Sequence, residues 1–180
     1  MQPAPIFQKV FREIYGKPCW NVKPGYGSFF SLEFGKPHLE VREPTVASKD
    51  ASRKVQKTLA RRSVFVHGEW SLRIDSCAWE VLSKGRHVGN GSKKPSMRRA
   101  ADLLSGQKLI QFSFLPKEVQ CILEFDLGAT LKTMPYDRKG EQWVLHTPDQ
   151  KALTLRADRR YQYMRVDLSR DRGVWKPALK

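Results

Sequence analysis

The sequence predicts an α+β fold dominated by antiparallel strands, and two features of its pattern lead to this prediction. Apolar and polar residues alternate with a period of two in many short stretches, and clusters of Gly, Pro and Asp separate these stretches at regular intervals. Many short strands with turns between them form a meander, which closes into a barrel or packs as a sandwich. At 180 residues the chain has the length of one domain, so we predict a single domain over residues 1–180.

The first expected element is an amphipathic helix over residues 4–15, followed by Gly16 as a stop. Its apolar residues recur at helical spacing and are Ile6, Phe7, Val10, Phe11, Ile14 and Tyr15. This spacing predicts that one side of the N-terminal helix packs on the core.

Strands follow this helix. Residues 30–34 and 39–41 alternate in polarity around the Gly-Lys-Pro sequence at 35–37, which predicts two strands joined by a tight turn. Alternation resumes over residues 63–82, and both tryptophans of that stretch are expected in the core. Further strands are expected at residues 109–115, 119–127, 130–134, 142–146 and 152–155.

Three basic segments interrupt or end this pattern. Residues 43–62 have almost no apolar pattern and predict a mobile connection, with a short basic helix around residues 50–60. Residues 85–95 are Gly-rich and lead into one short internal helix over residues 96–105. Residues 159–180 read as a basic C-terminal tail.

The cysteines and the N-terminus indicate the compartment. Cys19, Cys77 and Cys121 are odd in number and widely spaced, which favours a reducing compartment and thiols packed as small hydrophobic groups. No apolar run approaches the ~20 residues of a membrane span, and the N-terminus lacks the order of a signal peptide. We therefore expect a cytoplasmic protein with no membrane contact.

Charge is the main indication of a partner. The chain has 33 Lys and Arg against 18 Asp and Glu, a net charge of +15, which favours a polyanion and nucleic acid above all. The surplus concentrates in residues 49–62, 84–99 and 156–165. The candidate nucleic-acid-binding residues in these runs are Arg53, Lys54, Lys57, Arg61, Arg62, Arg86, Lys93, Lys94, Arg98, Arg99, Arg156, Arg159, Arg160, Tyr161, Tyr163 and Arg165.

Each basic run has a physical argument and an alternative. In the first run, a helix would align Arg53, Lys57 and Arg61 on one face, whereas the alternative is a disordered charged loop. The second run leads into a helix N-terminus, which favours an anion, whereas the alternative is a solvated loop. In the third run, Tyr161 and Tyr163 suit stacking on unpaired bases, whereas the alternative is that they cover the rim of the core.

No catalytic or metal-binding motif stands out in the sequence. The four histidines and three cysteines lack the spacing of zinc ligands. His38 with Glu40 and His67 with Glu69 read as ordinary neighbours on strands, and the alternative is a nuclease that uses His38, Glu40 or Asp75. We therefore expect no enzyme activity, no metal and no cofactor.

Several segments of the chain resemble an uncharacterised family of small bacterial β-rich proteins. The segments are Gly16-Lys17-Pro18-Cys19-Trp20, Gly25-Tyr26-Gly27-Ser28-Phe29, Leu32-Glu33-Phe34-Gly35-Lys36-Pro37-His38-Leu39, Gly106-Gln107-Lys108-Leu109, Phe125-Asp126-Leu127-Gly128 and Leu153-Thr154-Leu155-Arg156-Ala157-Asp158. The family pattern has paired cysteines where this chain has Ser76-Cys77. The resemblance implies one compact unit and brings no known activity.

The expected function is therefore non-enzymatic binding of RNA or DNA, as a subunit of a bacterial ribonucleoprotein, defence or mobile-element complex. The alternative is an immunity-type or adaptor protein whose basic face binds an acidic protein partner, because charge alone does not identify the polyanion.

Overall fold

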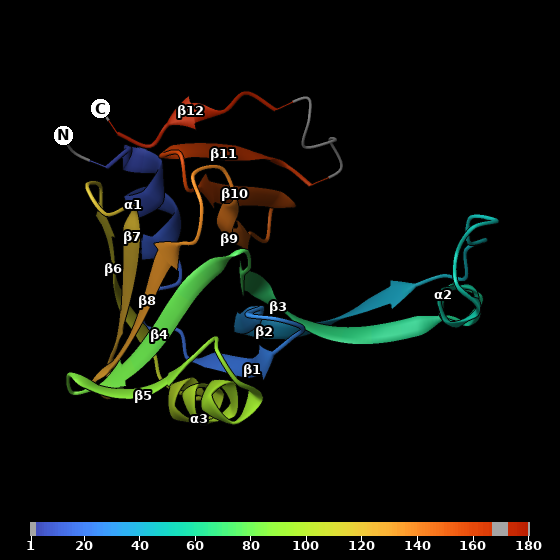
Figure 1. Ribbon diagram of the computed structural model, residues 1–180, viewed down its shortest axis with the longest axis horizontal. Coiled ribbons are helices and arrows are strands. Elements are labelled where there is room, and N and C mark those ends of the chain that lie inside the picture. The colour runs from blue at the N-terminus through green and yellow to red at the C-terminus, as the bar shows by residue number, and fades with distance from the viewer. Residues whose placement is uncertain (1–2, 167–172, 180) are drawn as a thin grey trace.

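The computed structural model describes residues 3–166 and 173–179, which form two open antiparallel sheets and three helices (Figure 1). The first sheet has the strand order β1 (Cys19–Pro24), β2 (Phe30–Arg42), β3 (Ser63–Ile74), β9 (Glu141–His146), β10 (Lys151–Arg156), β11 (Arg160–Arg165) and β12 (Lys176–Pro177). The second has the order β5 (Arg86–Asn90), β4 (Cys77–Ser83), β8 (Ala129–Pro135), β7 (Gln120–Phe125) and β6 (Leu109–Leu115). The helices are α1 (Pro5–Arg12), α2 (Arg53–Leu59) and α3 (Lys94–Leu104). The α+β prediction is confirmed, and the sheets fit a sandwich instead of a closed barrel.

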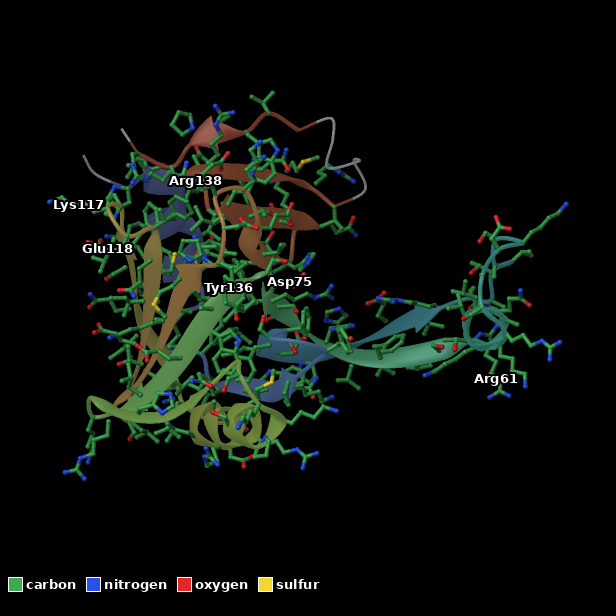
Figure 2. The ribbon with its side chains drawn as sticks, viewed as in Figure 1. Arg61, Asp75, Lys117, Glu118, Tyr136 and Arg138 are labelled. Carbon is green, nitrogen blue, oxygen red and sulfur yellow. The ribbon has the colours of Figure 1, made fainter. Side chains whose placement is uncertain are left out.

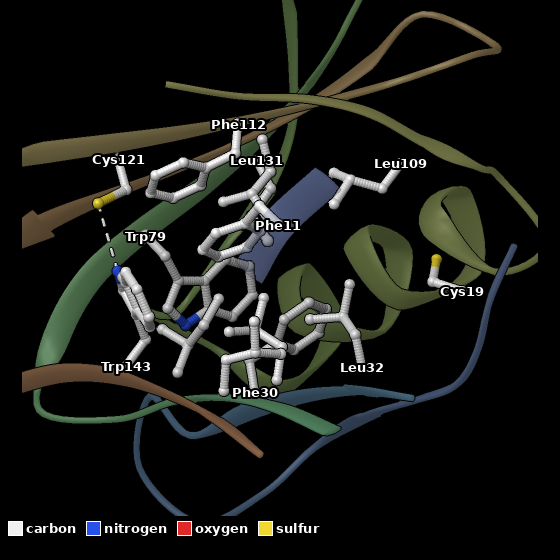
Figure 3. Packing of buried hydrophobic residues seen from close by; sticks show 14 of the residues in the cluster. Phe11, Cys19, Phe30, Leu32, Trp79, Leu109, Phe112, Cys121, Leu131 and Trp143 are labelled. Carbon is white, nitrogen blue, oxygen red and sulfur yellow. Dashed lines mark hydrogen bonds between the residues drawn. The ribbon is translucent and has the colours of Figure 1, made fainter. Parts of the chain in front are cut away.

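Helix α1 packs against both sheets through its aromatic residues. The Phe11 ring stacks on Phe112 of β6, with centroids 3.8 Å apart, and meets Trp143 of β9 edge to face at 5.6 Å (Figure 3). Because β6 and β9 belong to different sheets, one side chain joins the two halves of the core. The helix predicted over residues 4–15 is present and shorter, and its apolar stripe is buried as expected.

The tight turn predicted at residues 35–37 is wrong, because β2 is one continuous strand. The pairing of β2 with β3 shifts register between Phe34 and Pro37, and Gly35 has a φ of 77°. The Lys36 amide donates to the Glu69 carboxylate at 3.0 Å instead of to a turn partner. Gly35 and Pro37 therefore lie at a β-bulge, and β2 pairs with β3 on both sides of it. The sequence pattern predicts instead that the chain reverses direction there.

The Gly-rich segment at residues 85–95 also differs from the prediction. It contains strand β5, and α3 begins at Lys94, two residues before the predicted start at Ser96. A Cβ at Gly89 would lie 2.2 Å from the Ser96 carbonyl oxygen. Glycine is required there for close packing of α3 on β5, although in the sequence it reads as loop.

The outer halves of β2 and β3 leave the body as a two-stranded ribbon, which ends at α2 (Figure 1). We call residues 37–68 the arm. The segment at 43–62, predicted as a connection with a short basic helix, forms the tip of this arm, and the helix is present as α2. The predicted C-terminal tail begins with β11, and its residues 167–172 and 180 lie outside the described residues.

The predicted burial of two tryptophans and of the cysteines is confirmed. Trp70 and Trp79 are buried, and the cysteines are buried and free of disulfides. None of the helices in the described ranges is long and apolar enough to cross a membrane.

Candidate nucleic-acid interface

Local hydrogen bonds build the helix at the arm tip from a sequence rich in like charges. The Ser52 hydroxyl caps α2 by accepting from the Val55 amide at 3.4 Å, and the Gln56 side chain donates to the Ala51 carbonyl at 2.8 Å. These bonds offset the repulsion between Arg53 and Lys57, which are four residues apart on the helix.

A hollow of about 540 Å³ at the arm tip gathers the first basic run. Its lining residues are Arg53, Lys54, Lys57, Thr58, Arg61, Arg62 and Ser63, with no carboxylate among them. Arg62 pairs with Glu43 at 2.9 Å, whereas the other four cations have no ion-pair partner in the described part of the chain. The structure thus brings Arg53, Lys57 and Arg61 together, and Figure 2 shows Arg61 at the end of the arm, far from the body.

The second basic run lies on β5 and α3, at the opposite end of the body from β11 (Figure 1). Its exposed cations are Lys84, Arg86, Lys93, Lys94, Arg98 and Arg99. The N-terminus of α3 has no side-chain cap. The Asn90 side-chain oxygen accepts hydrogen bonds from the Ser92 amide, in the loop before α3, and from the Ser96 hydroxyl, in the first turn of α3. The exposed cations of this run form a solvated basic surface.

The arginines of the third run are held mainly by neighbours within the chain. Arg156 pairs with Asp158 at 2.9 Å and its guanidinium lies 4.6 Å from the centroid of the Trp175 ring. Arg159 donates to the Lys117 carbonyl at 3.2 Å. Two further members, Arg160 and Arg165, are exposed on β11.

The tyrosines of the third run pack on the core. The Tyr161 ring meets Phe7 edge to face at 5.3 Å, and Tyr163 is half-buried against the same core cluster, with Lys151 Nζ 5.6 Å from its ring centroid. The geometry matches the alternative in which these rings cover the rim of the core, since both are partly buried against the core cluster.

The three basic runs therefore do not share one surface. They lie at the arm tip, on the α3 end of the body and on the β10–β11 hairpin (Figure 1). The arm tip combines a concave shape with four cations that have no ion-pair partner in the described residues.

The base of the arm holds a polar network that the sequence did not indicate. Buried Glu33 accepts from the Gly68 amide at 3.0 Å and the Ser71 hydroxyl at 3.1 Å, and its Oε1 lies 3.3 Å from His67 Nδ1. His67 Nε2 lies 3.1 Å from Glu40 Oε2, at ion-pair distance but outside hydrogen-bond geometry. A hydrogen bond from Arg42 lowers the pKa of Glu40. His67 therefore links the body strand that carries Glu33 to the arm.

The residues of the nuclease alternative are not assembled at one place. His38 and Glu40 line a hollow of about 500 Å³ beside His67, whereas Asp75 accepts from the Ser76 amide at 2.7 Å at the β3–β4 corner and does not line that hollow. In the described ranges no group of three or more His, Cys, Asp or Glu side chains could hold a metal ion.

Comparison with protein-family models, with curated proteins and with solved structures found no match to this chain.

Proposed function

We propose that the protein binds nucleic acid through the basic tip of its arm. The observation that carries this proposal is the hollow lined by five cations, four of them without an ion-pair partner in the described chain. The excess of positive charge is concentrated in this segment, because residues 49–62 contain six Lys and Arg and the single acidic residue Asp50. Such an unneutralised surface binds phosphates by releasing their counterions.

The shape of the arm supports the same function. A two-stranded ribbon that carries a short helix has a width that the major groove of a duplex admits. Since the tip projects from the body, it reaches a groove or a loop while the sandwich remains outside (Figure 1).

The test is the salt dependence of binding by a variant of the tip. We expect the triple variant Arg53→Ala, Lys57→Ala, Arg61→Ala to bind duplex more weakly whatever its sequence. The slope of log K against log salt should fall in magnitude by about 2.7, if each cation neutralises one phosphate. Fluorescence anisotropy with labelled duplexes across a salt series measures this slope.

A matched control carries the same loss of charge on the body. Lys117, Arg138 and Lys139 are exposed, and Figure 2 shows Lys117 and Arg138 on the body, away from the arm tip. Replacing all three by Ala should leave the slope nearly unchanged. Equal effects of the two triple variants would mean that net charge alone drives binding, and a flat salt response of the unmodified protein would reject the function.

A second candidate function, binding of an acidic protein, is favoured by one face of the arm. Four exposed aliphatic residues pair across this face, Leu39 with Val66 and Val41 with Val64. An apolar strip beside a basic tip complements a protein surface that has an apolar patch flanked by carboxylates.

The double variant Leu39→Thr, Val41→Thr tests this candidate, because it makes the strip polar and threonine is well accommodated in a strand. We expect it to lose an acidic partner purified after nuclease treatment, measured by titration calorimetry, while nucleic-acid binding stays unchanged. Unaltered partner affinity would exclude the strip as a protein-binding surface.

A further inference from the structure

A third hollow lies at the base of the arm, between β1 and the outer half of β3, and aromatic side chains line it. Its volume is about 570 Å³, within the range of ~300–1,000 Å³ in which small-molecule sites fall. Trp20, Phe29 and Phe65 contribute the aromatic rings. No basic run of the sequence includes any of the three, which is why sequence reasoning missed this site.

The rings are held in place by the surrounding structure. Trp20 is half-buried, and its indole N–H donates to the Gly35 carbonyl at 3.0 Å, which fixes the ring beside the β2 bulge. Phe65 is 41% exposed on a paired strand, with the Arg42 guanidinium 4.8 Å from its ring centroid. Aromatic rings fixed on strands and open to solvent are the usual platform on which unpaired bases stack.

Polar groups around the rings suit a nucleotide. Lys23 and Arg73 line the hollow, and neither has an ion-pair partner within the described ranges. The Asn21 amide donates to the Val66 carbonyl at 3.5 Å, and its Oδ1 accepts no hydrogen bond from the described residues. An amide oxygen can accept from the amino group of a base, and two free cations can hold the flanking phosphates.

The one buried carboxylate of the hollow is already used by the protein. Glu33 accepts from the Gly68 amide and the Ser71 hydroxyl, and its Oε1 lies beside His67 Nδ1. Both of its carboxylate oxygens therefore have hydrogen-bond partners within the protein, and Lys23 and Arg73 are the cations of the hollow that can meet a phosphate.

We propose that this hollow binds one unpaired base of a single-stranded nucleic acid, stacked on the aromatic side chains, with the adjoining phosphates on Lys23 and Arg73. The inference rests on the proposed function and specifies it: the tip supplies salt-dependent contacts to phosphates, and the base of the arm selects strands with unpaired bases. A base inside a duplex cannot enter, because its faces are stacked.

The test compares two labelled single-stranded oligonucleotides of equal length and phosphate count, one with ordinary bases and one abasic at every position. We expect the unmodified protein to bind the strand with bases about ten-fold more tightly. Phe65→Leu keeps apolar bulk but removes the aromatic face, so the difference should disappear. Phe65→Tyr keeps the ring and should preserve the difference.

The outcomes separate this inference from the function on which it rests. Equal binding of the two strands by the unmodified protein, with a steep salt slope, would overturn the base-binding hollow and leave the arm tip as the site. A preference for bases that persists in Phe65→Leu would also overturn it. Absence of any binding at low salt would reject the proposed function itself.

Discussion

Replacing Phe11 by Ala is expected to lower the free energy of unfolding by about 4 kcal/mol, since truncating a buried Phe leaves a cavity and removes its transfer energy. Phe11 is fully buried, and its ring contacts both Phe112 and Trp143. Stacked aromatic pairs contribute about 0.5–1.5 kcal/mol beyond their buried area, so the cost should lie toward the upper part of the range for such substitutions. Denaturant unfolding followed by tryptophan fluorescence measures it.

The neighbouring substitution Arg12→Ala is the control, because Arg12 belongs to the same helix and is exposed. It should change the stability by less than about 0.5 kcal/mol. A cost below about 1 kcal/mol for Phe11→Ala would show that α1 does not hold the two sheets together.

Stability is expected to fall steeply above pH 9, because three buried thiols resist ionisation in the folded protein. Burial raises the pKa of Cys19 from 9.0 to about 12 and that of Cys121 also to about 12, and it raises the pKa of Cys77 in the same direction. In the unfolded chain each thiol ionises near its ordinary pKa. Stability is therefore fully present below pH 9 and is lost as the pH rises toward the folded-state values.

The size of this loss of stability follows from how strongly the thiols ionise in the unfolded chain. One pH unit above the ordinary pKa, each thiolate favours unfolding by about 1.4 kcal/mol, so three thiols together lower the stability at pH 10 by about 4 kcal/mol. Unfolding curves at pH 7 and pH 10 measure the loss. A thiol reagent at pH 8 should react with the cysteines only after denaturant is added.

The variant Cys121→Ala isolates one thiol from the lysines and tyrosines that titrate in the same range. Its loss of stability between pH 7 and pH 10 should be about 1.4 kcal/mol smaller than that of the unmodified protein. An unchanged loss would mean that Cys121 ionises equally well in both states.

Local pattern was sufficient for much of this fold. Helical spacing placed Phe7 and Phe11 on one side of the first helix, and alternation located β6 to β10 to within a few residues. Such patterns are visible because each element has one face in the core and one in water. At Gly35 and Gly89 the same pattern analysis gave the wrong structure. A glycine is equally compatible with a turn, a bulge or a close contact, and only the neighbouring strand or helix determines which of these forms.

The candidate sites divide in the same way. The sequence by itself determined the charge of residues 49–62 and the helical spacing of Arg53 and Lys57, because these are properties of composition and of neighbours along the chain. The predicted helical alignment does not extend to Arg61, because α2 ends at Leu59. Only the tertiary structure decided that this run stands at the end of an arm and that the β11 tyrosines pack on the core. Only the tertiary structure, too, brought Trp20 and Phe65, 45 residues apart in the numbering, to one hollow. Long-range strand pairing sets these positions, and no local period in the sequence records which strands will lie side by side.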